Sequence, residues 1–122
     1  MKQLTQAEEE IMLPLWNLEK AFVKEVLAEL PEPKPAYNTV STILRILEKK
    51  GFVGHEAFGK SHRYYPLISE KDYRKSLTQN LVSKFFKGSG KSLVSELIAE
   101  KELDLESLDE LLNELRKADG KS

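Results

Sequence analysis

The chain has 122 residues and a formal net charge of −1, and 40% of its residues are hydrophobic and 32% charged. This length allows one ordinary domain or a small head with an appendage, but not two large independent cores. The absence of cysteine excludes a disulfide framework, a thiolate nucleophile and any cysteine-containing zinc or copper site. No apolar run approaches the roughly 20 residues that span a bilayer, and the acidic, polar start is unlike a signal peptide, so we expect a cytoplasmic protein without membrane insertion.

The near-neutral total conceals a basic middle segment. Residues 34–75 carry nine Lys and Arg against four Asp and Glu, whereas residues 1–33 carry three against seven and residues 76–122 carry seven against nine. A basic segment between acidic flanks is typical of a surface that faces phosphate, so the charge pattern favours a nucleic-acid partner. Solvated charged faces are common, however, so the motifs must decide whether this segment binds nucleic acid.

Two amphipathic helices are predicted in the first 30 residues. Thr5 followed by Glu8 forms a capping box, and apolar residues then recur at helical spacing, which predicts a helix over residues 5–18. Pro14 lies inside it and should kink or restart it. A second helix is predicted over residues 20–30, with Phe22 on its apolar side, and three prolines in residues 31–35 end it.

Residues 37–50 form the most informative predicted helix. Apolar residues recur at i, i+3, i+4 and i+7 and should pack inward; they are Val40, Ile43, Leu44 and Leu47. The opposite side then presents short polar groups and cations, namely Asn38, Ser41, Thr42, Arg45 and Lys49. This set suits a recognition helix, because hydroxyls, amides and arginine bind base edges and phosphates. The alternative is an ordinary amphipathic helix with a solvated polar face.

A β-hairpin with a basic tip should follow. Gly51 ends the helix, residues 52–58 and 62–68 are predicted strands, and residues 59–61 form the turn. Three helices followed by a hairpin is the winged helix-turn-helix order, and Lys60, His62 and Arg63 would reach a phosphate backbone. His55, His62 and Glu56 could instead meet across the hairpin and bind a divalent metal. Histidines on a solvent-facing hairpin are more often exposed or in contact with phosphate, so we expect no metal and no other cofactor.

Residues 69–122 are predicted to form a helical dimerisation region. Ser69 and Asp72 give a helix-start signal, and three apolar stripes at helical spacing follow. Three short helices cannot enclose so many large side chains by themselves, so a second copy of the chain is the expected partner. The residues expected at this interface are Tyr73, Leu77, Leu81, Phe85, Leu97, Leu108, Leu111, Leu112 and Leu115. The alternative is that these helices pack back over the head.

Five separated blocks resemble the BlaI/MecI (penicillinase repressor) family in order and spacing. The blocks are LTQAEEEIM at 4–12, LW at 15–16, VKEV at 23–26, YNTVST with LRILEKKGFV within 37–53, and YYPL at 64–67. The resemblance extends over nearly all of the head, roughly residues 3–68, whereas residues 69–118 resemble the family in helix pattern more than in motif. We therefore expect a mainly α fold with a small β-hairpin. A winged helix-turn-helix head would occupy residues 1–68 and a helical dimerisation region residues 69–122.

The resemblance implies a bacterial repressor that binds a palindromic operator as a homodimer through its third helix and hairpin. The expected DNA-binding residues are Tyr37, Asn38, Thr39, Ser41, Thr42, Arg45, Lys49, Lys60, His62 and Arg63, with Thr42 and Arg45 the main candidates for base readout. The resemblance also implies relief of repression when a membrane-bound metalloprotease sensor leads to cleavage of the C-terminal region. No residue pair in 69–118 matches the family's cleavage site. Copper-responsive relatives use a C-terminal cysteine cluster, which this chain lacks.

Two other classes of function were weighed against a repressor. Catalysis is not expected, because the acidic residues lie mainly on outer helical faces and not in a cleft. A winged-helix adaptor that binds protein partners, using the same hairpin and C-terminal helices, is the stronger alternative. A DNA-binding dimer should lose affinity steeply between about 50 and 200 mM salt, whereas an adaptor should ignore DNA at any salt concentration.

Overall fold

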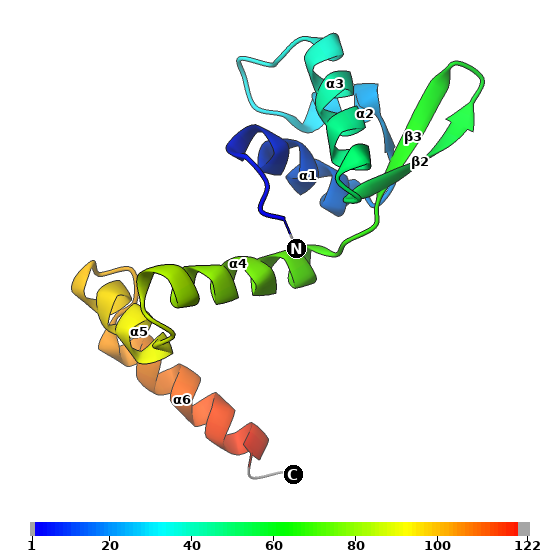
Figure 1. Cartoon of the computed structure of the whole chain (residues 1–122). Coiled ribbons are helices and arrows are strands. Elements are labelled where there is room, and N and C mark those ends of the chain that lie inside the picture. The colour runs from blue at the N-terminus through cyan, green and yellow to red at the C-terminus, as the bar shows by residue number, and fades with distance from the viewer. Residues whose placement is uncertain (1, 120–122) are drawn as a thin grey trace. The chain divides into compact units, whose positions relative to one another are not determined.

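A computed structural model describes residues 2–119, which form six helices and a small three-stranded sheet (Figure 1). The mainly helical class with a small β element is therefore confirmed. The chain divides into two compact units, one up to Leu77 and one from Thr78 onward. The first unit thus extends beyond residue 68, where the sequence placed the end of the head.

The first helix, α1, spans Gln6–Leu18 and begins at the predicted capping box. The Glu8 amide donates to Thr5 Oγ1 at 3.2 Å, and the Glu8 carboxylate accepts from the Thr5 amide at 2.8 Å. Of the two effects expected of Pro14, a kink or a restart, the restart does not occur, because the helix continues through this residue. Ile11, Met12 and Leu15 are buried on both sides of the proline, and this packing holds the helix together where one backbone donor is missing.

The second helix is shorter than predicted, because its expected first turn is a strand. Ala21–Phe22 form β1, which pairs antiparallel with the hairpin, and α2 spans only Val23–Glu29. The register places Ala21 opposite Tyr64 and Phe22 opposite Arg63. The apolar pattern that predicted a helix through Phe22 is thus satisfied in part by sheet pairing with residues about 40 positions away, which a local helical pattern cannot reveal.

The third helix and the hairpin follow the predicted order. Helix α3 spans Tyr37–Lys49, and β2 (Val53–Phe58) and β3 (Ser61–Pro66) form the hairpin, with sheet order β1-β3-β2. Gly51 and Gly59 have φ of 83° and 61°, which explains glycine after the helix and at the hairpin turn. Figure 1 shows the hairpin extending beside α3, as a wing does.

One hydrophobic core joins α1, α2, α3 and the sheet. Its largest fully buried side chains include Tyr64, Phe52, Met12, Leu15 and Leu44. Trp16 packs against this core and donates from Nε1 to the carbonyl of Ile68 at 2.8 Å. The predicted core positions of α3 are confirmed for Val40, Leu44 and Leu47, which are 0% exposed.

Tyr73 belongs to the head and not to a dimer interface. Helix α4 spans Glu70–Phe85, and Tyr73 in its first turn is only 3% exposed. The Tyr73 hydroxyl accepts from the Leu4 amide and donates to Glu9 Oε2, both at 2.9 Å, and its ring contacts Trp16 and Phe52. Leu77 also packs against this core. The assignment of Tyr73 to dimerisation is therefore wrong, because its side chain is already enclosed.

The second unit contains the end of α4 together with α5 (Gly90–Ala99) and α6 (Leu105–Asp119), which confirms the two further predicted helices. No residue of 78–119 is buried. Six large apolar side chains are widely exposed there, from 39% for Leu112 to 75% for Phe85; they are Leu81, Phe85, Leu105, Leu111, Leu112 and Leu115. Among the described residues, no helix is long and apolar enough to cross a membrane.

Candidate nucleic-acid interface

Helix α3 presents a polar, cationic face because its opposite face is fixed in the core. Val40, Leu44 and Leu47 anchor the underside. The residues that this anchoring leaves exposed include Tyr37, Asn38, Thr39, Thr42, Arg45, Ile46 and Lys49. Arg45 Nη2 lies 3.3 Å from Thr42 Oγ1, so these two candidates for base readout are adjacent at the surface. Ser41 is half-buried and contributes less to this face.

The N-terminus of α3 has no side-chain cap. Its N-cap residue is Ala36, and no acidic side chain lies in the first turn. The first amides of a helix carry a partial positive charge and bind anions such as phosphate. Tyr37 stands at this end and is 49% exposed, so its side chain does not simply pack against the core.

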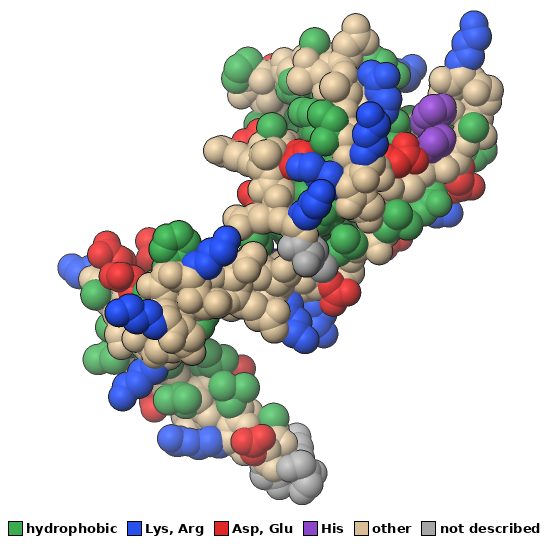
Figure 2. Space-filling view, in the orientation of Figure 1, with side chains coloured by type: hydrophobic (Ala, Val, Ile, Leu, Met, Phe, Trp, Pro, Cys, Tyr) green, Lys and Arg blue, Asp and Glu red, His purple; other side chains and the backbone are tan. Residues whose placement is uncertain are grey.

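The wing is fastened to α3 by a histidine contact. His55 on β2 hydrogen-bonds through Nδ1 to Glu48 Oε2 of α3, at 2.5 Å. The His62 ring stacks on His55, with centroids 4.1 Å apart and an angle of 11° between the planes. Lys60 at the turn is exposed. Figure 2 shows basic side chains over α3 and at the hairpin tip on one face of the head, with the histidine pair between them.

Arg63 does not join this face. Strand alternation places it on the other side of the wing from His62 and Tyr64. Its Nη2 lies 3.2 Å from Glu56 Oε1, and its guanidinium carbon lies 4.8 Å from the centre of the Phe58 ring. The hydrogen bond from Arg63, together with the charge of nearby Lys20, holds the pKa of Glu56 below its usual range. The structure thus brings His62 to the α3 side of the wing, leaves Lys60 exposed at the turn and places Arg63 on the opposite side.

The same geometry argues against a metal site in the hairpin. Glu56 faces Arg63, on the side of the wing opposite both histidines. The two imidazole rings lie parallel in a stack, so their nitrogens do not converge on one point. Among the described residues, no group of three or more histidine or carboxylate side chains could hold a metal ion.

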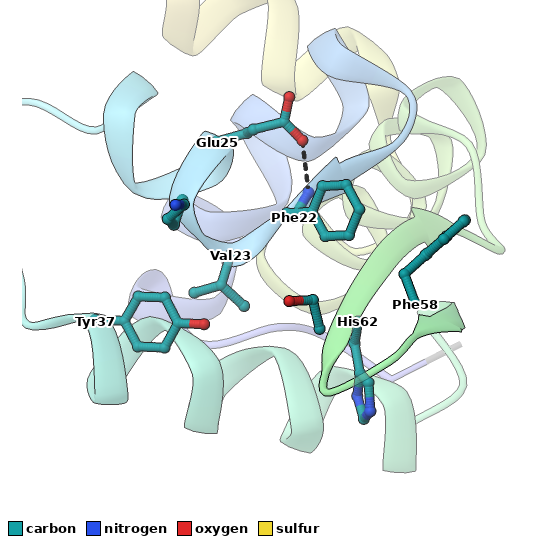
Figure 3. A pocket seen from close by; sticks show the side chains of 8 residues that line it. Phe22, Val23, Glu25, Tyr37, Phe58 and His62 are labelled. Atoms are coloured by element: carbon teal, nitrogen blue, oxygen red, sulfur yellow. Dashed lines mark hydrogen bonds between the residues drawn. The ribbon is translucent and has the colours of Figure 1, made fainter.

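A groove of about 570 Å³ lies between the start of α2, the start of α3 and the wing (Figure 3). Its walls combine apolar and polar groups from Phe22, Val23, Lys24, Glu25, Tyr37, Phe58, Ser61 and His62. The Glu25 carboxylate accepts from the Phe22 amide at 2.8 Å, so its charge is partly engaged by the backbone. The sequence pointed to Tyr37 and His62 but missed Phe22 and Lys24, because the prediction placed both in a continuous α2.

Two lysines of the basic segment have hydrogen-bond partners within the head. Lys50 donates to both carboxylate oxygens of Glu8, at 2.8 and 2.7 Å, and so ties the end of α3 to the start of α1. Lys34 donates to the carbonyls of Leu27, Ala28 and Leu30, at 3.1, 2.9 and 2.6 Å, and caps the C-terminus of α2. Part of the positive charge counted in residues 34–75 therefore serves the fold.

The Glu8 carboxylate is ionised despite its burial. Only 6% of its side chain is exposed, and this burial alone would raise its pKa. The hydrogen bonds from Lys50 and Thr5, with the positive charge of Lys50, outweigh that effect and lower the pKa. The ion pair is thus a structural element that ties the end of α3 to the start of α1.

Sequence comparisons with known proteins point to one family. The family model described as penicillinase repressor matches residues 4–117. The methicillin resistance regulatory protein MecI of Staphylococcus aureus (strain N315) is 29% identical over 116 residues, which cover 94% of each chain. The penicillinase repressor of Bacillus licheniformis is 30% identical over 110 residues, 89% of this chain and 86% of that relative. The solution structure of the DNA-binding domain of the repressor BlaI is similar with a TM-score of 0.51 and 35% identity, over 58% of this chain and 88% of that one.

Proposed function

The chain belongs to the penicillinase repressor family, and we propose on that basis that it is a transcriptional repressor that binds operator DNA as a homodimer. The observation that carries the proposal is the exposed face of α3. Its polar and cationic side chains point outward because Val40, Leu44 and Leu47 are fully buried beneath them. A helix of this kind, beside a basic hairpin, is the arrangement that enters a major groove while the wing contacts the adjacent backbone.

Within this proposal the residues divide into base readers and phosphate contacts. Thr42 and Arg45 lie together on the exposed face and are assigned to base edges. Asn38 and Thr39, near the uncapped start of α3, are assigned to bases or phosphate at the entry of the helix into the groove. Lys49, Lys60 and His62 are assigned to the backbone. Arg63 is left out, because Glu56 and Phe58 already engage it.

The groove beside α3 fits a segment of sugar-phosphate backbone. It separates the start of α3 from the wing, so a duplex read by the helix and touched by the wing would pass a strand between them. Lys24 and the Tyr37 hydroxyl on its walls supply a cation and a hydrogen-bond donor, and Phe22 and Phe58 supply apolar surface for the sugars. This assignment gives Tyr37 a phosphate-contacting role.

In this proposal the second unit forms the dimer interface. No residue of 78–119 is buried within one chain, although α6 alone carries four leucines at least 39% exposed. A twofold partner would cover these side chains, and two copies of α3 would then read half-sites about 34 Å apart, which requires a palindromic operator. We assign DNA binding to the head and dimerisation to the residues beyond Leu77.

Selection from a random duplex pool, followed by binding measurements at several salt concentrations, tests the proposal. A recovered palindrome is the expected result, with R45A weakening specific binding about tenfold or more relative to random DNA. K91A, which removes an exposed lysine of α5, serves as the charge-matched control and should bind as the wild type does. If no sequence is enriched and DNA is ignored at about 50 mM salt, the head is an adaptor module and the proposal fails.

Release of repression by proteolysis is the part of the proposal that comes from family membership alone. A protease requires accessible backbone outside regular helices, and in the second unit this is found in the short turns between α4 and α5 and between α5 and α6. Cleavage in either place would cut the chain within the proposed dimerisation unit and weaken operator binding. The protein would be incubated with membranes that contain the metalloprotease sensor, and mass spectrometry of the fragments would locate the cut.

A further inference from the structure

Ile46 stands out on the exposed face of α3 because it is the large aliphatic residue among polar and cationic neighbours. It is 41% exposed, whereas Leu44 and Leu47 on the same helix are 0% exposed. It lies one turn after Thr42 and one turn before Lys49, so it belongs to the proposed DNA-facing surface. Single exposed hydrophobic residues are common on proteins, so the position of Ile46, and not its exposure alone, carries the argument.

Isoleucine can recognise only one feature of a major groove. Its side chain has no donor or acceptor, so it cannot pair with the base edges that distinguish guanine, adenine and cytosine, and it gains nothing from phosphate. The apolar group that the major groove presents is the C5-methyl of thymine. An isoleucine pressed against a base without a methyl group would instead desolvate polar edges and leave them unpaired.

We propose that Ile46 is a specificity-determining residue that selects thymine at one position of each half-site, through contact with its C5-methyl group. This inference rests on the proposed function, since it requires α3 to lie in the major groove. The adjacent Thr42–Arg45 pair, with Nη2 and Oγ1 3.3 Å apart, reads the neighbouring bases. The side chain of Ile46 is short, so the contacted thymine lies where the helix axis approaches the base pairs most closely.

Replacing thymidine by 2′-deoxyuridine tests the contact, because the two nucleosides differ only by the methyl group. Each thymine of the selected operator is replaced in turn, symmetrically in both half-sites, and affinity is measured by fluorescence anisotropy. For the wild type we expect one position at which removing the methyl lowers affinity about fourfold per half-site, the factor that corresponds to one buried methyl group. The other positions should change little.

The I46A variant identifies the residue responsible. I46A should bind the operator with thymine at that position and the operator with deoxyuridine there with equal affinity. Base changes at the positions read by Arg45 should still lower the affinity of I46A as they lower that of the wild type. I46V, which keeps a branched side chain, should retain part of the discrimination. L13A removes an exposed leucine of α1, 54% exposed, and serves as the control that leaves the methyl effect intact. Thermal unfolding of I46A should match the wild type, since its side chain is exposed.

The outcomes separate this inference from the function on which it rests. If selection enriches no sequence, the repressor function fails, and the assignment of Ile46 fails with it. If a palindrome is recovered but no methyl removal affects the wild type, or the effect is the same in I46A, only the inference about Ile46 is refuted. A recovered half-site without thymine among the base pairs read by α3 would refute it as well.

Discussion

Replacing Glu8 by Gln should destabilise the head, and the structure gives the size of the effect. The Lys50 ammonium donates to both oxygens of Glu8, at 2.8 and 2.7 Å, and the side chains are 27% and 6% exposed. A hydrogen bond to a charged group contributes about 1.5–3 kcal/mol when it is well shielded. Because Lys50 keeps some access to water, we expect the lower end of that range, about 1.5–2 kcal/mol. Gln keeps the side-chain oxygen that accepts from the Thr5 amide.

A double-mutant cycle of E8Q and K50M measures this interaction directly. The free energy of unfolding is measured by urea titration of the full chain at one fixed protein concentration. Unfolding is followed by the fluorescence of Trp16, because it is the only tryptophan of the sequence and packs against the head core. The Lys20–Glu56 pair is the matched control. Its atoms are 3.6 Å apart and both side chains are largely exposed, so its cycle should show no resolvable coupling. If the Glu8–Lys50 coupling is also absent, the inference that this pair positions α3 is wrong.

The pH dependence follows from the lowered pKa of Glu8. A carboxyl whose pKa is lower in the folded than in the unfolded state adds stability above the unfolded pKa and loses it as pH falls through the folded pKa. Above about pH 5.5 the free energy of unfolding of the wild type should therefore exceed that of E8Q by a constant amount. This difference should shrink as the pH falls below the ordinary glutamate pKa of about 4.3. A margin that grows on acidification would contradict the direction of the pKa shift.

Three further predictions follow from the head and the second unit. K60A should lower the affinity for specific and random DNA alike and reduce the slope of log affinity against log salt by about 1, whereas R63A should leave that slope unchanged because Glu56 already pairs with Arg63. Y73F should cost about 1–2 kcal/mol of unfolding free energy, measured by urea titration, because it leaves the buried Leu4 amide without its acceptor. L111D combined with L112D should convert the dimer to a monomer in sedimentation velocity, and a dimer that persists would place the interface elsewhere.

Local sequence signals predicted the elements of the head because each has a cause within a few residues. The capping box at Thr5 and Glu8, the apolar stripe of α3 and the glycines at turns all act through the backbone close to them. The features that were missed depend on distant partners. Strand β1 exists because Ala21 pairs with Tyr64, and Tyr73 is buried because Leu4, Trp16 and Phe52 surround it.

The candidate site was predicted in outline for the same reason. Helical periodicity alone places Thr42, Arg45 and Lys49 on the exposed side of α3. Charge type, however, does not reveal which cations are already paired, and Lys34, Lys50 and Arg63 each have an internal partner. Strand alternation alone places His62 and Arg63 on opposite faces of the wing, but the sequence does not show which of the two faces lies toward α3.

The way in which α3 is held bears on how the two units divide the proposed function. Lys50 ties its end to Glu8, Glu48 ties it to His55 of the wing, and its underside is buried in a core that also encloses Tyr73. All of these contacts lie within the head, so the orientation of the α3 face does not depend on a partner chain. It follows that a dimer-breaking change such as L111D with L112D should weaken operator binding without altering which bases a half-site prefers. A changed half-site preference in that variant would mean that the partner chain helps to place α3.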